Sequence, residues 1–147
     1  MRTHALVLSL SLFAFSSLAH AELQLITSDE AKLPKATGQI ASRGVTRGPG
    51  IKVLSPDPAA KLGSGPFDLK IAFEPRGSSK IDPSSVTVTY LKSPAVDLTE
   101  RVKSGIKPGG IELSKTTVPA GEHPVRVTVK DDEGRQTSLT FNISVAN

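Results

Sequence analysis

Near the end of the chain, apolar and polar residues alternate in two segments that follow each other closely. In the segment 125–129 three valines alternate with an arginine and a threonine, and in the segment 139–145 every second residue is a large apolar one. The Asp-Glu-Gly sequence between them is typical of a turn. Strict alternation indicates a β-strand with one buried face. The two segments therefore predict a β-hairpin with Phe141 on its buried face and Asn142 on its exposed face.

The same period of two occurs upstream in shorter segments, which are 51–54, 67–73, 86–91 and 110–114. Prolines and glycines separate these segments and would interrupt a helix or a central strand at each point. Six to seven short strands predict an all-β fold, an antiparallel β-sandwich in which two sheets bury each other's apolar faces. Burial of these faces, at about 25 cal/mol per Å² of apolar surface, is the main driving force for folding.

One short helix is expected between two of the strands. The sequence Asp-Leu-Thr-Glu-Arg-Val at 97–102 places Asp97 as the capping residue and Glu100 three positions later, as in a capping box. Gly105 follows at the point where such a helix would end. We expect one or two helical turns that cross from one sheet to the other.

The first residues have the composition of a secretory signal peptide. Arg2 is followed by an apolar segment at 5–18 and by Ala-His-Ala, a small-x-small cleavage pattern. The apolar segment is shorter than the roughly 20 residues of a membrane helix. No later segment is apolar enough to span a membrane, so no transmembrane segment is expected in the mature chain. We predict a signal peptide over residues 1–21 and an exported protein, located in the periplasm or outside the cell.

Residues 22–50 are predicted to form a flexible, basic N-terminal arm before a domain at 51–147. The second half of the arm is rich in glycine, arginine and small residues and has no sustained apolar period. Ahead of it, Thr27 or Ser28 could cap a single helical turn that Pro34 would end.

Four basic residues lie in the arm and at the start of the domain: Arg43, Arg47, Lys52 and Lys61. They could dock the protein on an anionic component of the cell envelope or on an acidic partner. The alternative is that this segment is solvated and mobile and that its charges have no partner.

The composition argues against several other features. The chain has no cysteine, so no disulfide supports the fold, although an exported protein could hold one. Loss of Arg2 with the signal peptide leaves 17 of the 18 basic residues against 14 acidic ones, and these charges are scattered along the chain. Aromatic residues are few and there is no long block of one charge, so nucleic-acid binding is not expected.

The sequence from Gly121 to Val145 resembles the closing strands of bacterial immunoglobulin-like domains. In those domains a Gly-x-aromatic corner leads into an alternating strand, an aspartate, a glycine turn and a last alternating strand. The sequence Ile-Asp-Pro-Ser-Ser-Val-Thr-Val at 81–88 is similar to the start of an earlier strand. The resemblance covers residues 51–147 and implies an immunoglobulin-like sandwich. It departs from the family pattern at His123, where a tyrosine is usual, and in the insertion at 97–102.

His123 is the one histidine that remains if cleavage follows Ala21. Acid–base chemistry near neutral pH would therefore depend on His123 or on a carboxylate with a shifted pKa. The alternative is a structural corner, in which the imidazole ring bonds to the backbone just before the strand. No residue near His123 in the sequence marks a nucleophile. We expect no enzymatic activity and no cofactor.

Three adjacent carboxylates, Asp131, Asp132 and Glu133, suggest a calcium site, because calcium binds six to eight oxygen atoms. The simpler interpretation is a hairpin turn in which Gly134 has a positive φ and Asp131 accepts hydrogen bonds from backbone N–H groups.

Members of the immunoglobulin-like family serve as adhesins, spacers, partner-binding modules and appendages of enzymes, so the resemblance implies the fold more than the function. The sequence favours an exported, non-enzymatic interaction module that recognises another protein or a cell-envelope component. Its contact surface would be a sheet edge, a loop end or the N-terminal arm. The alternatives are a calcium-binding domain and a purely structural spacer.

Overall fold

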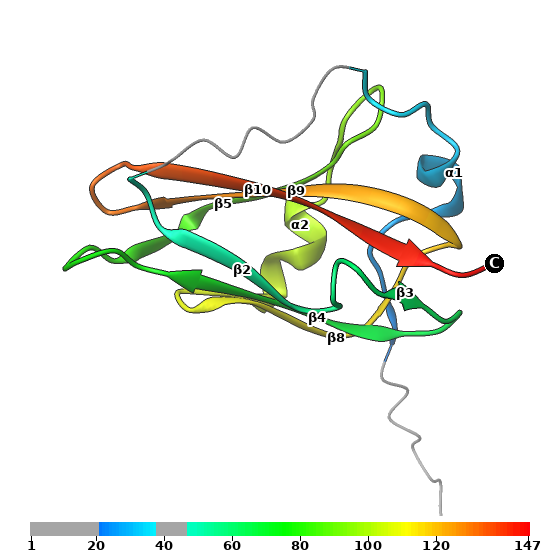
Figure 1. The fold of residues 1–147 in the computed structure, drawn as a ribbon, viewed down its shortest axis with the longest axis horizontal. Helices are drawn as coiled ribbons and strands as arrows, with labels where there is room; N and C mark the ends of the chain where they lie inside the picture. Colours follow the sequence, from blue (N-terminus) through cyan, green and yellow to red (C-terminus); the bar gives the residue numbers. More distant parts are fainter. Residues whose placement is uncertain (1–20, 38–46) are drawn as a thin grey trace, which may run out of the picture.

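The computed structural model describes residues 21–37 and 47–147, which form an all-β, sandwich-like fold of two facing sheets with two short α-helices (Figure 1). The strands are β1 (Leu23–Gln24), β2 (Gly50–Ser55), β3 (Lys61–Leu62), β4 (Phe67–Glu74), β5 (Ile81–Tyr90), β6 (Val96–Asp97), β7 (Ile106–Lys107), β8 (Gly110–Thr117), β9 (Gly121–Asp131) and β10 (Gln136–Val145). The helices are α1 (Ser28–Ala31) and α2 (Thr99–Val102), and a 3₁₀ turn, η1 (Lys103–Gly105), follows α2.

The first sheet has the strand order β1-β8-β4-β2, with β7 also paired to β8, and the second has the order β3-β10-β9-β5-β6. The described residues form ten strands, more than the six to seven that the sequence predicts, and six of the ten are six residues or longer. The other four have two residues each. The sheets are mixed and not purely antiparallel, because β1 runs parallel to β8 and β3 runs parallel to β10.

The predicted hairpin is formed by β9 and β10. The two strands pair without interruption from Gln136 opposite Lys130 to Val145 opposite Gly121. Phe141 is buried and Asn142 is exposed, so the predicted orientation of this strand is confirmed. Gly134 closes the turn with a φ of +77°, a conformation that glycine adopts without strain.

The core lies between the two sheets and consists mainly of the inward-facing residues of the long strands. It includes Leu69, Ile71, Phe73, Val86, Val88, Tyr90, Ile111, Leu113, Val125, Val127, Val129, Phe141, Ile143 and Val145. On each strand these residues alternate with partly or fully exposed ones. The pattern of period two therefore identifies the buried faces of both sheets.

The sequence predicts a flexible arm over residues 22–50. In the structure, the first described part of this segment, residues 22–37, packs against the domain instead. Leu25 and Ile26 are fully buried, and β1 pairs with the C-terminal end of β8. Thr27, one of the two predicted capping residues, caps α1, because its hydroxyl accepts a hydrogen bond from the backbone N–H of Glu30. Two apolar residues of this segment thus join the core. The sequence does not reveal this contribution, because residues 23–26 are simply four apolar or amide residues in a row.

Two basic side chains from the second sheet and its helical crossover hold the N-terminal segment in place. The guanidinium of Arg101 donates to both carboxylate oxygens of Glu30, at 2.8 and 2.6 Å, and to the carbonyl of Leu25 at 2.8 Å. The ammonium of Lys92 donates to the carbonyls of Ala31, the last residue of α1, and of Leu33, two residues beyond it, each at 2.8 Å.

The contacts with Arg101 change the pKa of Glu30. The hydrogen bonds from Arg101 lower the pKa of Glu30 from 4.5 to about 2; burial opposes this change, and hydrogen bonds from Thr27 add to it. A charge-assisted pair with two parallel hydrogen bonds is among the stronger polar interactions in proteins. This pair joins segments that are far apart in the sequence.

The helix that was predicted at 97–102 is present but begins later than expected. Leu98 occupies the capping position, while the carboxylate of Asp97 accepts a hydrogen bond from the N–H of Thr99 at 2.8 Å. Glu100 pairs with Lys103 and does not reach back to the capping residue. The reason is that Asp97 still belongs to β6, where it pairs with Thr89.

Replacement of Phe141 by alanine should lower the free energy of unfolding by about 3 to 5 kcal/mol, because it leaves a cavity in the core. Replacement of the exposed Asn142 by alanine is the matched control and should have a much smaller effect. Chemical denaturation of both variants measures the difference. Equal losses would contradict the strand orientation.

Candidate functional site

The three carboxylates of the β9–β10 turn are occupied with structural hydrogen bonds. One oxygen of Asp131 accepts from the N–H groups of Glu133 and Arg135, and the other accepts from the Arg135 guanidinium at 2.8 Å. Asp132 accepts from the N–H of Lys80, and Glu133 pairs with Arg135. Within the described residues no group of three His, Cys, Asp or Glu side chains could hold a metal ion. The hydrogen bonds of Asp131 are those that the turn interpretation predicts.

Three of the four predicted basic residues lie among the described residues. Arg43 lies outside the described residues. Arg47 is exposed on the segment that leads into β2, Lys52 is exposed on β2 in the first sheet, and Lys61 is exposed on β3 in the second sheet. The three described residues thus lie on three different segments of the fold.

His123 has the structural corner role. Its Nε2 lies 2.8 Å from the carbonyl oxygen of Pro119, which can only accept, so Nε2 carries the proton and donates. Its Nδ1 then accepts from the hydroxyl of Tyr90 at 2.9 Å. Both ring nitrogens of this buried imidazole are engaged, and neither is placed to act as a base on a bound molecule.

The environment of this pair keeps both side chains neutral. Burial lowers the pKa of His123 and the charge of Lys92 adds to this effect, while the hydrogen bond to Pro119 opposes it. Burial also raises the pKa of Tyr90 to about 12, with a smaller contribution from the charge of Glu30. The hydrogen bonds thus link two neutral groups in the interior.

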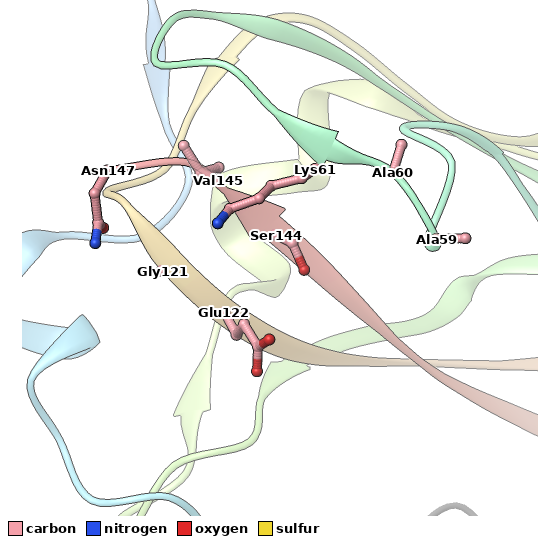
Figure 2. Close-up of a pocket in the computed structure, with 8 residues that line it drawn as sticks. All are labelled: Ala59, Ala60, Lys61, Gly121, Glu122, Ser144, Val145 and Asn147. Atoms are coloured by element: carbon pink, nitrogen blue, oxygen red, sulfur yellow. The ribbon is translucent and has the colours of Figure 1, made fainter.

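A shallow hollow of about 250 Å³ lies where β3, β9 and β10 meet (Figure 2). Figure 2 shows Lys61, Glu122 and Ser144 on its rim, with small residues of the loop before β3 beside them. Lys61 and Glu122 are exposed and have no aromatic neighbour in the hollow. An open hollow of this kind offers little buried surface with which to hold a small molecule.

The outer edge of β10 is the more distinctive feature. On one side β10 pairs with β9 along its full length, but on the other side only Ser144 and Val145 pair, with β3. At the opposite end the chain passes close to β10, since a Cβ atom on Gly48 would lie 3.0 Å from the carbonyl oxygen of Gln136. Between these two points, residues 138–142 have no strand beside them among the described residues.

The pairing identifies the backbone groups that face outward. The carbonyl of Pro124 accepts a hydrogen bond from Leu91, so Pro124 faces β5 and Val125 faces β10. Because Val125 lies opposite Phe141, the odd-numbered residues of β10 bond to β9. The N–H and C=O groups of Ser138, Thr140 and Asn142 therefore point away from the sheet. The hydrogen bond from the next even-numbered residue, Ala146, to Leu62 of β3 agrees with this assignment.

The outer edge of β10 lacks the features that usually protect an exposed strand. Its residues 138–142 include no charged side chain, no proline and no bulge. By contrast, the outer edge of β2 carries Lys52, has a bulge between Val53 and Ser55, and ends at Pro56. The β10 edge is thus suited to accept a further strand. The two ends of this unpaired edge are set by Gly48 and β3, whose positions in the fold cannot be predicted from the sequence. The uncharged stretch itself can be recognised in the sequence.

Comparison with known proteins identified no relative, since no family model, no curated protein and no solved structure matches the chain. In the part of the chain that the structure describes, no helix has the length and apolar character needed to cross a membrane.

The stability of the wild type relative to His123→Tyr should depend on pH. Because burial lowers the pKa of His123, the unfolded chain takes up a proton near pH 6.5 and the folded chain does so only at lower pH. The wild type should therefore lose stability relative to the variant as the pH falls from about 7.5 to 5. Denaturation at several pH values measures this difference. A difference that stays constant over this range would show that the histidine is not held neutral.

Proposed function

We propose that this protein is an exported, non-enzymatic immunoglobulin-like module that binds another protein by adding an extended segment of that protein to the outer edge of β10. The backbone groups that face outward between Gly48 and β3 carry this proposal. In strand addition, main-chain hydrogen bonds supply affinity and alternate side chains supply specificity. Each such hydrogen bond contributes about 0.5 to 1.5 kcal/mol net.

The strand order supports the immunoglobulin-like assignment. In that fold strands A, B and E belong to one sheet and strands C, F and G to the other. Here β2, β4 and β8 would correspond to A, B and E, and β5, β9 and β10 to C, F and G. His123 adds further support, because its bond to Pro119 resembles the tyrosine corner, in which a tyrosine hydroxyl on strand F bonds to the backbone a few residues upstream.

Export to the periplasm or to the outside of the cell is proposed, and the signal-peptide pattern at residues 1–21 supports it. The absence of enzymatic activity is proposed because both nitrogens of His123 are engaged and the turn carboxylates bind backbone and Arg135. A protein is favoured over another envelope component, because lipids and polysaccharides have no backbone ladder to match that of a strand.

Changes at Thr140 should abolish capture of the partner. Thr140→Pro removes an outward N–H that takes no part in the pairing with β9, and Thr140→Lys adds the charge that protects natural edge strands. The measurement is a crosslinked pull-down from periplasmic extract with residues 22–147 as bait, quantified by mass spectrometry.

Thr128→Lys is the matched control, because Thr128 carries the same side chain on the adjacent central strand. The wild type and Thr128→Lys should retain a partner that both Thr140 variants lose, while all four proteins keep similar melting temperatures. Retention of every specific partner by both Thr140 variants would exclude the β10 edge as the binding site.

A further inference from the structure

We infer that the segment bound at β10 places a large aliphatic side chain beside Leu139, where it closes the open side of the sandwich between β10 and β2. This inference rests on the proposed strand addition and specifies the chemistry of the partner segment. It follows from the length of the unpaired edge and from the uneven burial of the apolar side chains at this side of the sandwich.

The part of β10 that no described strand pairs with, residues 138–142, fixes the alignment of the segment. Gly48 limits this free edge at one end and β3 limits it at the other, so Thr140 is its central residue. Side chains of paired strands point to the same face at each level of a sheet. The central residue of the added segment would therefore project outward with Thr140, and its two neighbours would project inward with Leu139 and Phe141.

Inward-facing apolar side chains are less covered at this side of the sandwich than in the middle of the sheet. The inward-facing valines of the central strand β9 are at most 1 % exposed, and they are Val125, Val127 and Val129. Leu139 faces inward opposite Val127 but is only half-buried. On β2, Ile51 and Val53 are also half-buried, although they pack against the core. The open side thus offers apolar surface that an added strand can bury.

The two sheets present this surface next to each other. Figure 1 shows β2 and β10 on the same side of the molecule, and residues of these two strands are in contact. Ile51 and Val53 supply the apolar surface of the first sheet there, and Leu139 supplies that of the second. A side chain that is added beside Leu139 and directed inward would therefore lie along the boundary between the sheets.

The two inward positions of the added segment differ in how much they can bury. Phe141 is only 7 % exposed, so a side chain beside it has little further apolar surface to cover. Leu139 is more exposed, so the gain from burial is concentrated beside Leu139. Valine, leucine or isoleucine is favoured at that position, while a small or polar residue is sufficient beside Phe141.

The remaining contacts of the segment discriminate little between sequences. The free edge presents Ser138, Thr140 and Asn142 on the outer face, and these side chains are polar and uncharged. Main-chain hydrogen bonds form with any sequence, each contributes little net free energy, and binding must also offset the lost freedom of a flexible segment. The side chain beside Leu139 therefore selects one segment over another.

A second copy of the chain does not fit this edge. If two β10 strands paired in antiparallel fashion about Thr140, Gln136 of one copy would lie beside Ser144 of the other, where β3 is already paired. A strand that continues into a folded hairpin would therefore collide with β3. A linear segment that can bend away at both ends avoids this collision.

The test uses four capped peptides of sequence Thr-Ser-X-Thr-Z-Ser-Thr, in which X and Z are each valine or serine. Residue X lies beside Leu139 if the peptide runs parallel to β10, and residue Z does so if it runs antiparallel. Binding to residues 22–147 is measured by isothermal titration and by NMR shifts of the amides of Ser138, Thr140 and Asn142.

We expect the peptide with two valines and one of the two single-valine peptides to bind about tenfold more tightly than the peptide without valine. The other single-valine peptide should stay within about twofold of the peptide without valine, because its valine lies beside Phe141. A fifth peptide, with its one valine at the centre, is the control for general hydrophobicity. Its valine would project outward, so it should bind no more tightly than the peptide without valine.

Two protein variants make the assignment specific. In Leu139→Ala the advantage of the valine peptides should fall to less than about threefold, provided that the melting temperature shows a folded protein. Leu54→Ala is the control, because Leu54 is 56 % exposed on β2 and lines a separate hollow of the first sheet with Ala72 and Gly110. The advantage of valine should persist in this variant.

Three outcomes would overturn the inference, and they differ in what they say about the proposed function. Equal binding of all five peptides, with loss of binding in Thr140→Pro, would exclude the aliphatic position but leave strand addition intact. An advantage of valine that is unchanged in Leu139→Ala would also exclude this position. No binding of any peptide to the wild type at millimolar concentration would exclude both the inference and the proposed function.

Discussion

The structure depends on one constraint: the apolar face of each sheet must be covered by the other sheet, because the chain has no cysteine and therefore no disulfide to stabilise it. Strands of period two meet this constraint because every second residue joins the core. The same arrangement leaves backbone N–H and C=O groups at the sheet edges, where no further strand satisfies them. An open edge is thus a direct consequence of how this domain is stabilised.

The rest of the chain covers the edges of the two sheets to different extents. On the free side of β8, β1 and β7 each cover part of the edge, and the N-terminal segment that supplies β1 is held by Arg101 and Lys92. On the free side of β5, the strand β6 pairs near one end and Thr99 bonds to Val88. Within residues 21–37 and 47–147, β10 pairs on its outer side only with β3, at its C-terminal end. The part of β10 that no described strand pairs with is therefore the place where we propose that a partner strand completes the second sheet.

The sequence predicted those features that depend on local pattern. The alternation around Phe141, the turn at Gly134 and the capping of α1 by Thr27 all follow from residues close together in the chain. The packing of Leu25 and Ile26 was not predictable, because it depends on Arg101 and Lys92, more than sixty residues away in the sequence. The parallel pairs and the extent of the free edge were missed for the same reason, since they arise from contacts between distant segments.

The most direct test of the account is hydrogen exchange at single amides of β10, followed by NMR on the isolated protein. The amides of Ser138, Thr140 and Asn142 should exchange rapidly with solvent, while those of Leu139 and Phe141, which bond to β9, should be protected. Equal protection of all five amides would mean that the outer edge of β10 is already covered, and the binding site that we propose would not exist.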